Sequence, residues 1–345
     1  WDAMPALADL MPWQQPGCKF NRLWPIAPDP RSLEERWKTF VSAPIDKDRK
    51  DMMARGRDPG PSRETLFQTA ATGRSIETHV PGLERLADLR ADAPSLPVVR
   101  YGYRSFDRQW AFDDPRMAKT DSPALWQSVS DRQVFLVTSG TGEFSSGPVT
   151  TVTEAVPDLH YYCGRGGKDI LPLYRDRAGQ KPNVTTGLLP ALGRLLGMRE
   201  PSPEDLAAYL YALLSTPAYQ ERFAAELQTP GPRVPLTRDP ALWTRAVDIG
   251  QRLLWLHTFA ERFRDPGAGR DARVPKVAGL EWVSPVRRMP ATARDISYDP
   301  TIGQIRVGDG VVAGVRPEVW TFSVSGMQVV SKWLGYRTLS GSGRV

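Results

Sequence analysis

The chain has 345 residues, of which 41% are hydrophobic and 24% are charged, a balance typical of a folded globular protein. No stretch approaches the ~18 uninterrupted apolar residues that a membrane-spanning helix needs. Two cysteines give no disulfide framework, which excludes a disulfide-stabilised secreted scaffold and favours a reducing cytoplasm.

The net charge is +6, and most of the basic residues are Arg. The planar guanidinium of Arg pairs bidentately with phosphate oxygens and with the guanine edge, so this bias suits a nucleic-acid surface. A GC-rich genome raises Arg content in the same way, and charge alone therefore does not decide the function. The chain begins at Trp1 without an initiator Met, and residues 1–10 already carry an apolar pattern, so we expect a piece of a longer protein.

Residues 1–97 are expected to form an N-terminal segment and a helical connector. Leu33, Trp37 and Phe40 lie at helical spacing, and Asp29 or Ser32 could cap this helix. From Val41 to Gly82 the chain is polar and interrupted by Pro and Gly, which is typical of an exposed, helix-rich connector.

Residues 98–200 are expected to form a mixed-sheet part. Apolar residues between Val98 and Phe112 predict two paired strands around a turn at Arg104–Asp107. Gln133–Thr138 and Val149–Val156 are rich in β-branched and aromatic residues, and each predicts a further strand.

Residues 201–265 are expected to form a helical subdomain. Ser202 and Pro203 are typical of a capped helix start, and Pro217 should end that helix. A second helix should carry Tyr219, and a third should run from Asp239 to His257, which we expect to be a partnered core residue.

Residues 266–345 return to strands, predicted at Gln304–Val307 and Trp320–Val324, and then to a short helix that contains Trp333. The sequence therefore predicts an α+β fold in which a mixed β-sheet is combined with a helical subdomain.

The chain lacks the motifs that several kinds of DNA chemistry need. An amino-methyltransferase receives the flipped base on Asn (or Asp)-Pro-Pro-aromatic, and neither Asn21 nor Asn183 is followed by Pro-Pro. Pro28-Asp29 with Asp48-Arg49-Lys50 matches the letters of a nuclease, but the second half lies in a polar run without a strand pattern. A solvated face is the favoured reading of that run.

Nucleotide and metal sites are not predicted either. The glycine-rich Ser139–Gly147 lacks a Lys followed by Ser or Thr and is followed by Pro148, so a hairpin loop is favoured over a phosphate loop. His160 and Cys163 could supply two ligands, whereas a structural zinc site requires four. We predict no catalytic residue, no metal and no cofactor within this chain.

Several dispersed blocks resemble the C-terminal target-recognition (specificity) domain of Type ISP restriction-modification enzymes, which are adenine-specific DNA methyltransferases. Tyr103-Arg-Ser-Phe-Asp107 is similar to that family's Tyr-Arg-Pro-Phe-Asp signature, with Ser105 in place of Pro. Gly17–Arg22, Leu171–Tyr174, the helix pair from Leu206 to Phe223, Pro232–Pro235 and Tyr298–Arg337 resemble further family blocks in the same order. Within these blocks Tyr103, Phe106, Asp107 and Trp333 are the structural signature.

The resemblance implies a bacterial, cytoplasmic parent enzyme with an adenine methyltransferase domain that binds S-adenosylmethionine (SAM). In that family a helicase-like ATPase and a nuclease accompany it. This chain is then expected to recognise a sequence in duplex DNA for restriction-modification or phage defence. The alternative is a coupling module that contacts the methyltransferase domain and no DNA.

Basic and amide side chains alternate with aromatic ones along the predicted hairpin, which could place them along a DNA groove. The aromatics themselves are expected to be core residues, and Asp107 is expected to have a structural role as the ion-pair partner of Arg104 or Arg108. Arg108 and Gln109 are predicted to lie nearer the base edges than Arg104. The candidate DNA contacts are Arg104, Arg108, Gln109, Arg116, Lys119, Arg132, Arg165 and Lys168.

Overall fold

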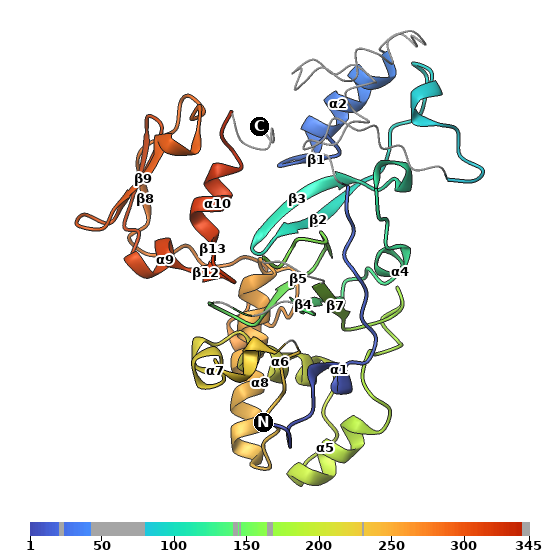
Figure 1. The fold of residues 1–345 in the computed structure, drawn as a ribbon, viewed down its shortest axis with the longest axis vertical. Coiled ribbons are helices and arrows are strands. Elements are labelled where there is room, and N and C mark those ends of the chain that lie inside the picture. Colours follow the sequence, from blue (N-terminus) through green and yellow to red (C-terminus); the bar gives the residue numbers. More distant parts are fainter. Residues whose placement is uncertain are drawn as a thin grey trace.

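The computed structural model describes residues 1–20, 24–42, 80–140, 144, 146–163, 168–229 and 231–339. It is an α+β structure with several small sheets and a separate group of helices (Figure 1). Three features singled out in the sequence lie wholly or partly outside the described residues: most of the 41–82 connector, the Asp48–Lys50 run, and residues 141–143 and 145 of the glycine-rich loop. No helix in the described part of the chain is long and apolar enough to span a bilayer.

A four-stranded mixed sheet with the order β1-β3-β2-β6 holds the signature block. Strands β2 and β3 form the predicted antiparallel hairpin, and β2 pairs in parallel with β6. The prediction of paired strands around a turn at Arg104–Asp107 is thus confirmed. The strands are β1 (Ile26–Ala27), β2 (Val98–Arg104), β3 (Asp107–Phe112) and β6 (Val156–Pro157).

The predicted N-terminal helix is α2, and it packs against this sheet. Leu33, Trp37 and Phe40 are buried, and Trp37 and Phe40 lie against other aromatic rings. Of the two expected caps, Asp29 accepts a hydrogen bond from the Ser32 backbone N–H at 2.9 Å. The helices and turns before β4 are α1 (Leu7–Leu10), α2 (Pro30–Ser42), η2 (Leu86–Asp88), η3 (Pro115–Met117) and α4 (Pro123–Trp126).

A second sheet, with the order β5-β4-β7, is antiparallel and lies at the centre of the main hydrophobic core. Every residue of β4 and β5 is buried, which explains their near-continuous apolar and Thr-rich sequences. One mixed-sheet part was predicted for residues 98–200, whereas the chain divides these strands between two sheets. The strands are β4 (Phe135–Ser139), β5 (Thr150–Thr153) and β7 (Lys168–Pro172).

The predicted helical subdomain is built around α6 and α8, which pack against each other. Ser202 caps α6 as predicted, and together with Asp205 it forms a capping box; α8 begins at Pro240 as expected, and Asp239 caps it. Tyr209 of α6 stacks on Trp243 of α8, with ring centroids 4.3 Å apart. The helices are α5 (Leu188–Leu196), α6 (Pro203–Leu214), α7 (Pro217–Arg222), η4 (Glu226–Gln228), α8 (Pro240–His257) and η5 (Pro266–Ala268).

Residues 281–339, which we call the C-terminal module, form a four-stranded antiparallel sheet with the order β8-β11-β10-β9 and two short helices. Ile305, Val307 and Val315 form a small core that is separate from the main one. Trp320 was predicted to lie in a strand but lies in α9, because Pro317 starts a short helix there. The elements are β8 (Glu281–Ser284), η6 (Ala293–Asp295), β9 (Ile296–Asp299), β10 (Gln304–Val307), β11 (Gly310–Ala313), α9 (Pro317–Thr321), β12 (Ser323–Val324), β13 (Met327–Gln328) and α10 (Val329–Gly335).

Candidate nucleic-acid interface

The signature turn joins β2 to β3 and is held from three sides. Ser105 donates its hydroxyl to the Tyr161 carbonyl at 2.8 Å. Phe106 adopts a left-handed backbone conformation (φ 62°), and its ring lies against His257 and Phe322. A non-glycine residue in this conformation is uncommon, so these contacts must outweigh its cost.

Asp107 joins the two sequence blocks that carry the family resemblance. The Asp107 carboxylate is 3% exposed and pairs with Arg337, the nearest N–O distance being 2.8 Å. Tyr103 and Tyr336, the neighbours of this pair, meet edge to face. The expected ion pair of Asp107 with Arg104 or Arg108 was therefore wrong: the partner, Arg337, lies in the turn after α10.

Arg104, at the end of β2, pairs with Asp158, with an N–O distance of 2.8 Å. Its guanidinium also lies 3.9 Å from the centre of the Tyr103 ring. Tyr101 donates its hydroxyl to the same Asp158 carboxylate, and burial raises the pKa of that tyrosine. Arg104 is thus part of a buried polar network in this structure.

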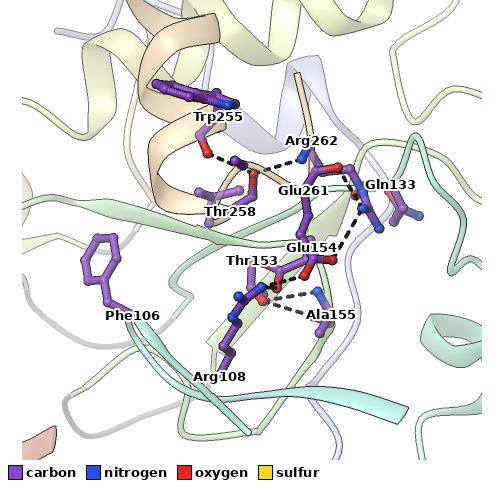
Figure 2. Close-up of polar contacts among 12 residues, drawn as sticks. Phe106, Arg108, Gln133, Thr153, Glu154, Ala155, Trp255, Thr258, Glu261 and Arg262 are labelled. Atoms are coloured by element: carbon purple, nitrogen blue, oxygen red, sulfur yellow. Dashed lines mark hydrogen bonds and ion pairs between the residues drawn. The ribbon is translucent and has the colours of Figure 1, made fainter. Parts of the chain in front are cut away.

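Arg108 connects β3 to the end of the helical subdomain. Figure 2 shows its guanidinium directed toward Glu154 and Glu261, and the N–O distances are 3.3 and 2.6 Å. Burial raises the pKa of Glu154, and the charge of Arg108 opposes that rise. Arg262 extends the network by donating to the backbone carbonyls of Gln133 and Ser130.

Two more of the candidate contacts are also inside the protein. Gln109 has no exposed surface, and its amide donates to Asp107 at 3.0 Å. Arg116 is buried against Asp114, which accepts hydrogen bonds from both its backbone and its guanidinium. In this conformation neither side chain presents a donor at the protein surface.

The remaining candidates are more accessible or are not described. Lys119 and Arg132 are exposed, and Arg132 pairs with Glu204 beside the hydroxyl of Tyr174. Arg165 lies outside the described residues, and Lys168 begins β7 but its side chain is not described. The roles of all eight residues in DNA contact stay predictions.

Other exposed arginines were missed because they do not alternate with aromatic residues as those of the hairpin do. Arg287, Arg288, Arg294 and Arg306 of the C-terminal module are exposed. The signal that could have found them is the strand alternation of β10, where buried Ile305 and Val307 force Arg306 to the outer face of the sheet. Within the described residues, no three His, Cys, Asp or Glu side chains gather in a group able to hold a metal ion.

A comparison with protein families places these features in context. The model of the Type ISP C-terminal specificity domain matches residues 9–344. The chain belongs to this family. A search of curated proteins found no match. This match confirms the resemblance to the family that the signature block and the Tyr298–Arg337 block suggested.

Solved structures of large enzymes share the fold of this specificity domain. A nuclease-deletion mutant of the Type ISP restriction-modification enzyme LlaGI, in complex with a DNA substrate mimic, matches with a TM-score of 0.60 and 16% identity, over 100% of this chain and 26% of that one. The ATP-dependent Type ISP enzyme LlaBIII bound to DNA matches with a TM-score of 0.60 and 15% identity, over 100% of this chain and 22% of that one. The DrdV–DNA complex matches with a TM-score of 0.58 and 20% identity, over 91% of this chain and 30% of that one. The chain thus spans less than a third of each of these proteins.

Proposed function

We propose that this specificity domain recognises a sequence in duplex DNA and positions an adenine methyltransferase domain of the same enzyme on it. The observation that carries the proposal is the match of residues 9–344 to the specificity-domain family. The three structural relatives support it, because each was solved with DNA or a DNA mimic. Methyl transfer is assigned to another domain, since the chain has no Asn-Pro-Pro-aromatic or Asp-Pro-Pro-aromatic motif.

The signature block serves this function as a support for the reading surface. Asp107 fixes the hairpin turn to Arg337, and Arg108 fixes β3 to Glu261 beyond the end of α8. A binding surface needs such rigid support, because a small displacement of its contacts weakens recognition. We therefore assign positioning roles to Arg104, Arg108 and Arg116, and DNA contact to exposed cations such as Lys119.

Duplex binding and its salt dependence test the proposal. Fluorescence anisotropy of a labelled duplex, titrated with the full chain at several salt concentrations, should give an affinity that falls linearly with log salt. The slope should be near −0.9 per neutralised phosphate. Absent or salt-insensitive binding would overturn the proposal.

Contact with another domain is the second candidate function, and α8 favours it. Leu242 and Ile249 are 56% and 45% exposed and lie seven residues apart on one helix face. Large exposed apolar side chains on one face are typical of a protein interface. This coupling role would be favoured if the chain bound no duplex DNA and a methyltransferase domain supplied in trans bound the chain through α8.

A further inference from the structure

The cations of the main body and those of the C-terminal module differ in how they are paired. In the body, Arg104, Arg108, Arg116, Arg132 and Arg270 each lie within 4 Å of a carboxylate. Among the described residues of the C-terminal module, Arg337 alone forms such an ion pair, and its partner is in the body. Exposed arginines without an ion pair also occur in the described part of the body, for example Arg238, Arg245 and Arg252, so what distinguishes the module is how its arginines are grouped.

Four of these exposed arginines come together at one end of the module's sheet. The backbone N–H groups of Arg287 and Arg288 donate to Asp309 in the β10–β11 turn, at 3.1 and 3.4 Å. Arg306 precedes the same turn on β10, opposite Ser297 of β9. The turn also holds η6, because the Gly308 N–H donates to the Asp295 carbonyl, which places Arg294 beside it.

The two acidic side chains at this end are occupied by backbone groups. Asp309 accepts from the two N–H groups just named, and these hydrogen bonds lower its pKa, with a smaller contribution from the charge of Arg288. Asp295 accepts from the N–H and hydroxyl of Thr292. Four arginines and two acidic residues thus lie at this end of the sheet, and among the described residues none of these arginines forms an ion pair with Asp295 or Asp309. This end therefore keeps an excess of positive charge.

We propose that Arg287, Arg288, Arg294 and Arg306 form a phosphate-contact surface for duplex DNA on the C-terminal module. The inference rests on the proposed function and names the surface that serves it. A guanidinium offers a planar pair of donors to two phosphate oxygens. The four side chains are exposed and form no hydrogen bond or ion pair with the described part of the chain, which suits contact with the phosphate backbone and gives affinity that is independent of sequence.

The test compares two triple variants with the same loss of charge. The first combines Arg288→Ala, Arg294→Ala and Arg306→Ala. The control combines Arg238→Ala, Arg245→Ala and Arg252→Ala, which are exposed arginines on or just before α8. Helix α8 lies in the lower half of Figure 1, whereas β8 and β9 lie in the upper half. Both variants are titrated into the same labelled duplex over a range of salt.

The module variant should lose a salt slope of about 0.9 for each phosphate contact removed. At ~0.1 M salt, counterion release contributes up to roughly eightfold per contact, so affinity should fall at least tenfold for any duplex sequence. The control should keep the slope and affinity of the parent chain within about twofold. Arg→Lys at the same three module positions should restore the slope, because Lys keeps the charge.

Each outcome decides between the two proposals. If the parent chain binds no duplex, the proposed function fails and this surface fails with it. If the parent binds with a steep salt slope while the module and control variants weaken equally, recognition stands and the surface is wrong. A module variant that has lost its thermal unfolding transition is replaced by the three single variants, and unchanged slopes in all of them overturn the inference.

Discussion

Asp107 shows at the scale of one residue how distant parts of this chain are joined. Its carboxylate binds Arg337 and accepts a hydrogen bond from Gln109, and both contacts are shielded from water. Removing one partner of a buried ion pair leaves the other charge uncompensated, which costs about 3–5 kcal/mol. We expect Asp107→Ala to lower the free energy of unfolding by about 3 kcal/mol, measured by urea denaturation.

An exposed ion pair provides the control for this substitution. Arg31 and Glu35 lie four residues apart on α2, with side chains that are 85% and 62% exposed. Such pairs contribute at most a few tenths of a kcal/mol, so Glu35→Ala should change the unfolding free energy by less than about 0.5 kcal/mol. Equal effects of the two substitutions would show that the Asp107 pair does not hold the hairpin to α10.

His257 should make the stability of the domain depend on pH. Burial lowers its pKa to about 4, and its ring nitrogen lies 2.7 Å from the hydroxyl of Tyr211. An unfolded histidine has a pKa of about 6.5, so between pH 6.5 and 4 the unfolded state binds a proton that the folded state does not. Stability should therefore fall as the pH is lowered through this window, by up to about 3 kcal/mol in total.

The carboxylates of the chain also titrate in part of this window, so the measurement needs a variant. His257→Gln keeps a group that can bond to Tyr211 and removes the titration. The difference in unfolding free energy between the parent and this variant should shrink as the pH falls from about 6.5 to 4. A difference that is constant with pH would mean that His257 keeps an ordinary pKa.

Sequence reasoning at this scale missed the burial of Gln109, which it placed near the base edges of DNA, although the signal for that burial is local. The hairpin alternation pairs Gln109 with buried Tyr101, and reading that register would have placed Gln109 inside. The partner of Asp107 is different, because Arg337 lies 230 residues away and no local spacing indicates it. A long-range ion pair depends on how whole elements pack, which a single sequence does not encode in any short pattern.

Gly250 decides how closely two helices pack. It lies within α8 at its crossing with α6, where a Cβ would overlap the carbonyl oxygen of Ala208 and lie 2.9 Å from its Cα. Helix propensity alone predicts that Gly250→Ala stabilises α8 by up to about 1 kcal/mol. The contact is with backbone that cannot move aside alone, so we expect overpacking to win and the variant to lose about 2 kcal/mol or more.

A Gly→Ala substitution at a position without close backbone contact separates the effect of helix propensity from that of overpacking. Gly335 ends α10, and a Cβ there would make only an ordinary contact with the Ala293 side chain at 3.7 Å. Gly335→Ala should be neutral or stabilise the domain by a few tenths of a kcal/mol. Thermal or urea unfolding measures both, and a stabilised Gly250→Ala variant would show that the helices can move apart at little cost.

At the scale of elements, helix boundaries were predictable where capping residues announce them. Ser202-Pro203 and Asp239-Pro240 start α6 and α8 as expected, because a cap and a proline act on the adjacent backbone. The Trp320 segment was misjudged because its β-branched and aromatic residues favour a strand. The ring of Trp320 instead stacks on Tyr298, and this packing holds it in a short helix.

The whole molecule combines a large hydrophobic core with a small one. The sequence predicted the individual strands better than their grouping into sheets. The strands from Val98 to Val156 were expected in one mixed sheet, yet β4 and β5 pair with β7 in a sheet of their own. Which strands become neighbours in a sheet depends on the topology of the whole chain, and local sequence patterns do not show this. The DNA-contact surface that we infer is likewise a product of arrangement, since its arginines come from three separate elements.

The regions around the two hydrophobic cores should unfold locally and independently of each other. Phe135, Leu136 and Val137 of β4 have no exposed surface, whereas the module's core has three buried residues, and residues 271–280 before it are all exposed. Opening the four-stranded sheet of the module exposes little apolar surface, so amides of Gln304–Val307 should exchange with solvent at a lower free energy than those of Phe135–Ser139. Native-state hydrogen exchange read by mass spectrometry, at increasing urea concentrations below the unfolding transition, measures both. Rates that rise in proportion to hydroxide concentration verify that exchange reports equilibria, and one shared opening free energy for the two strands would show that module and body unfold as a single unit.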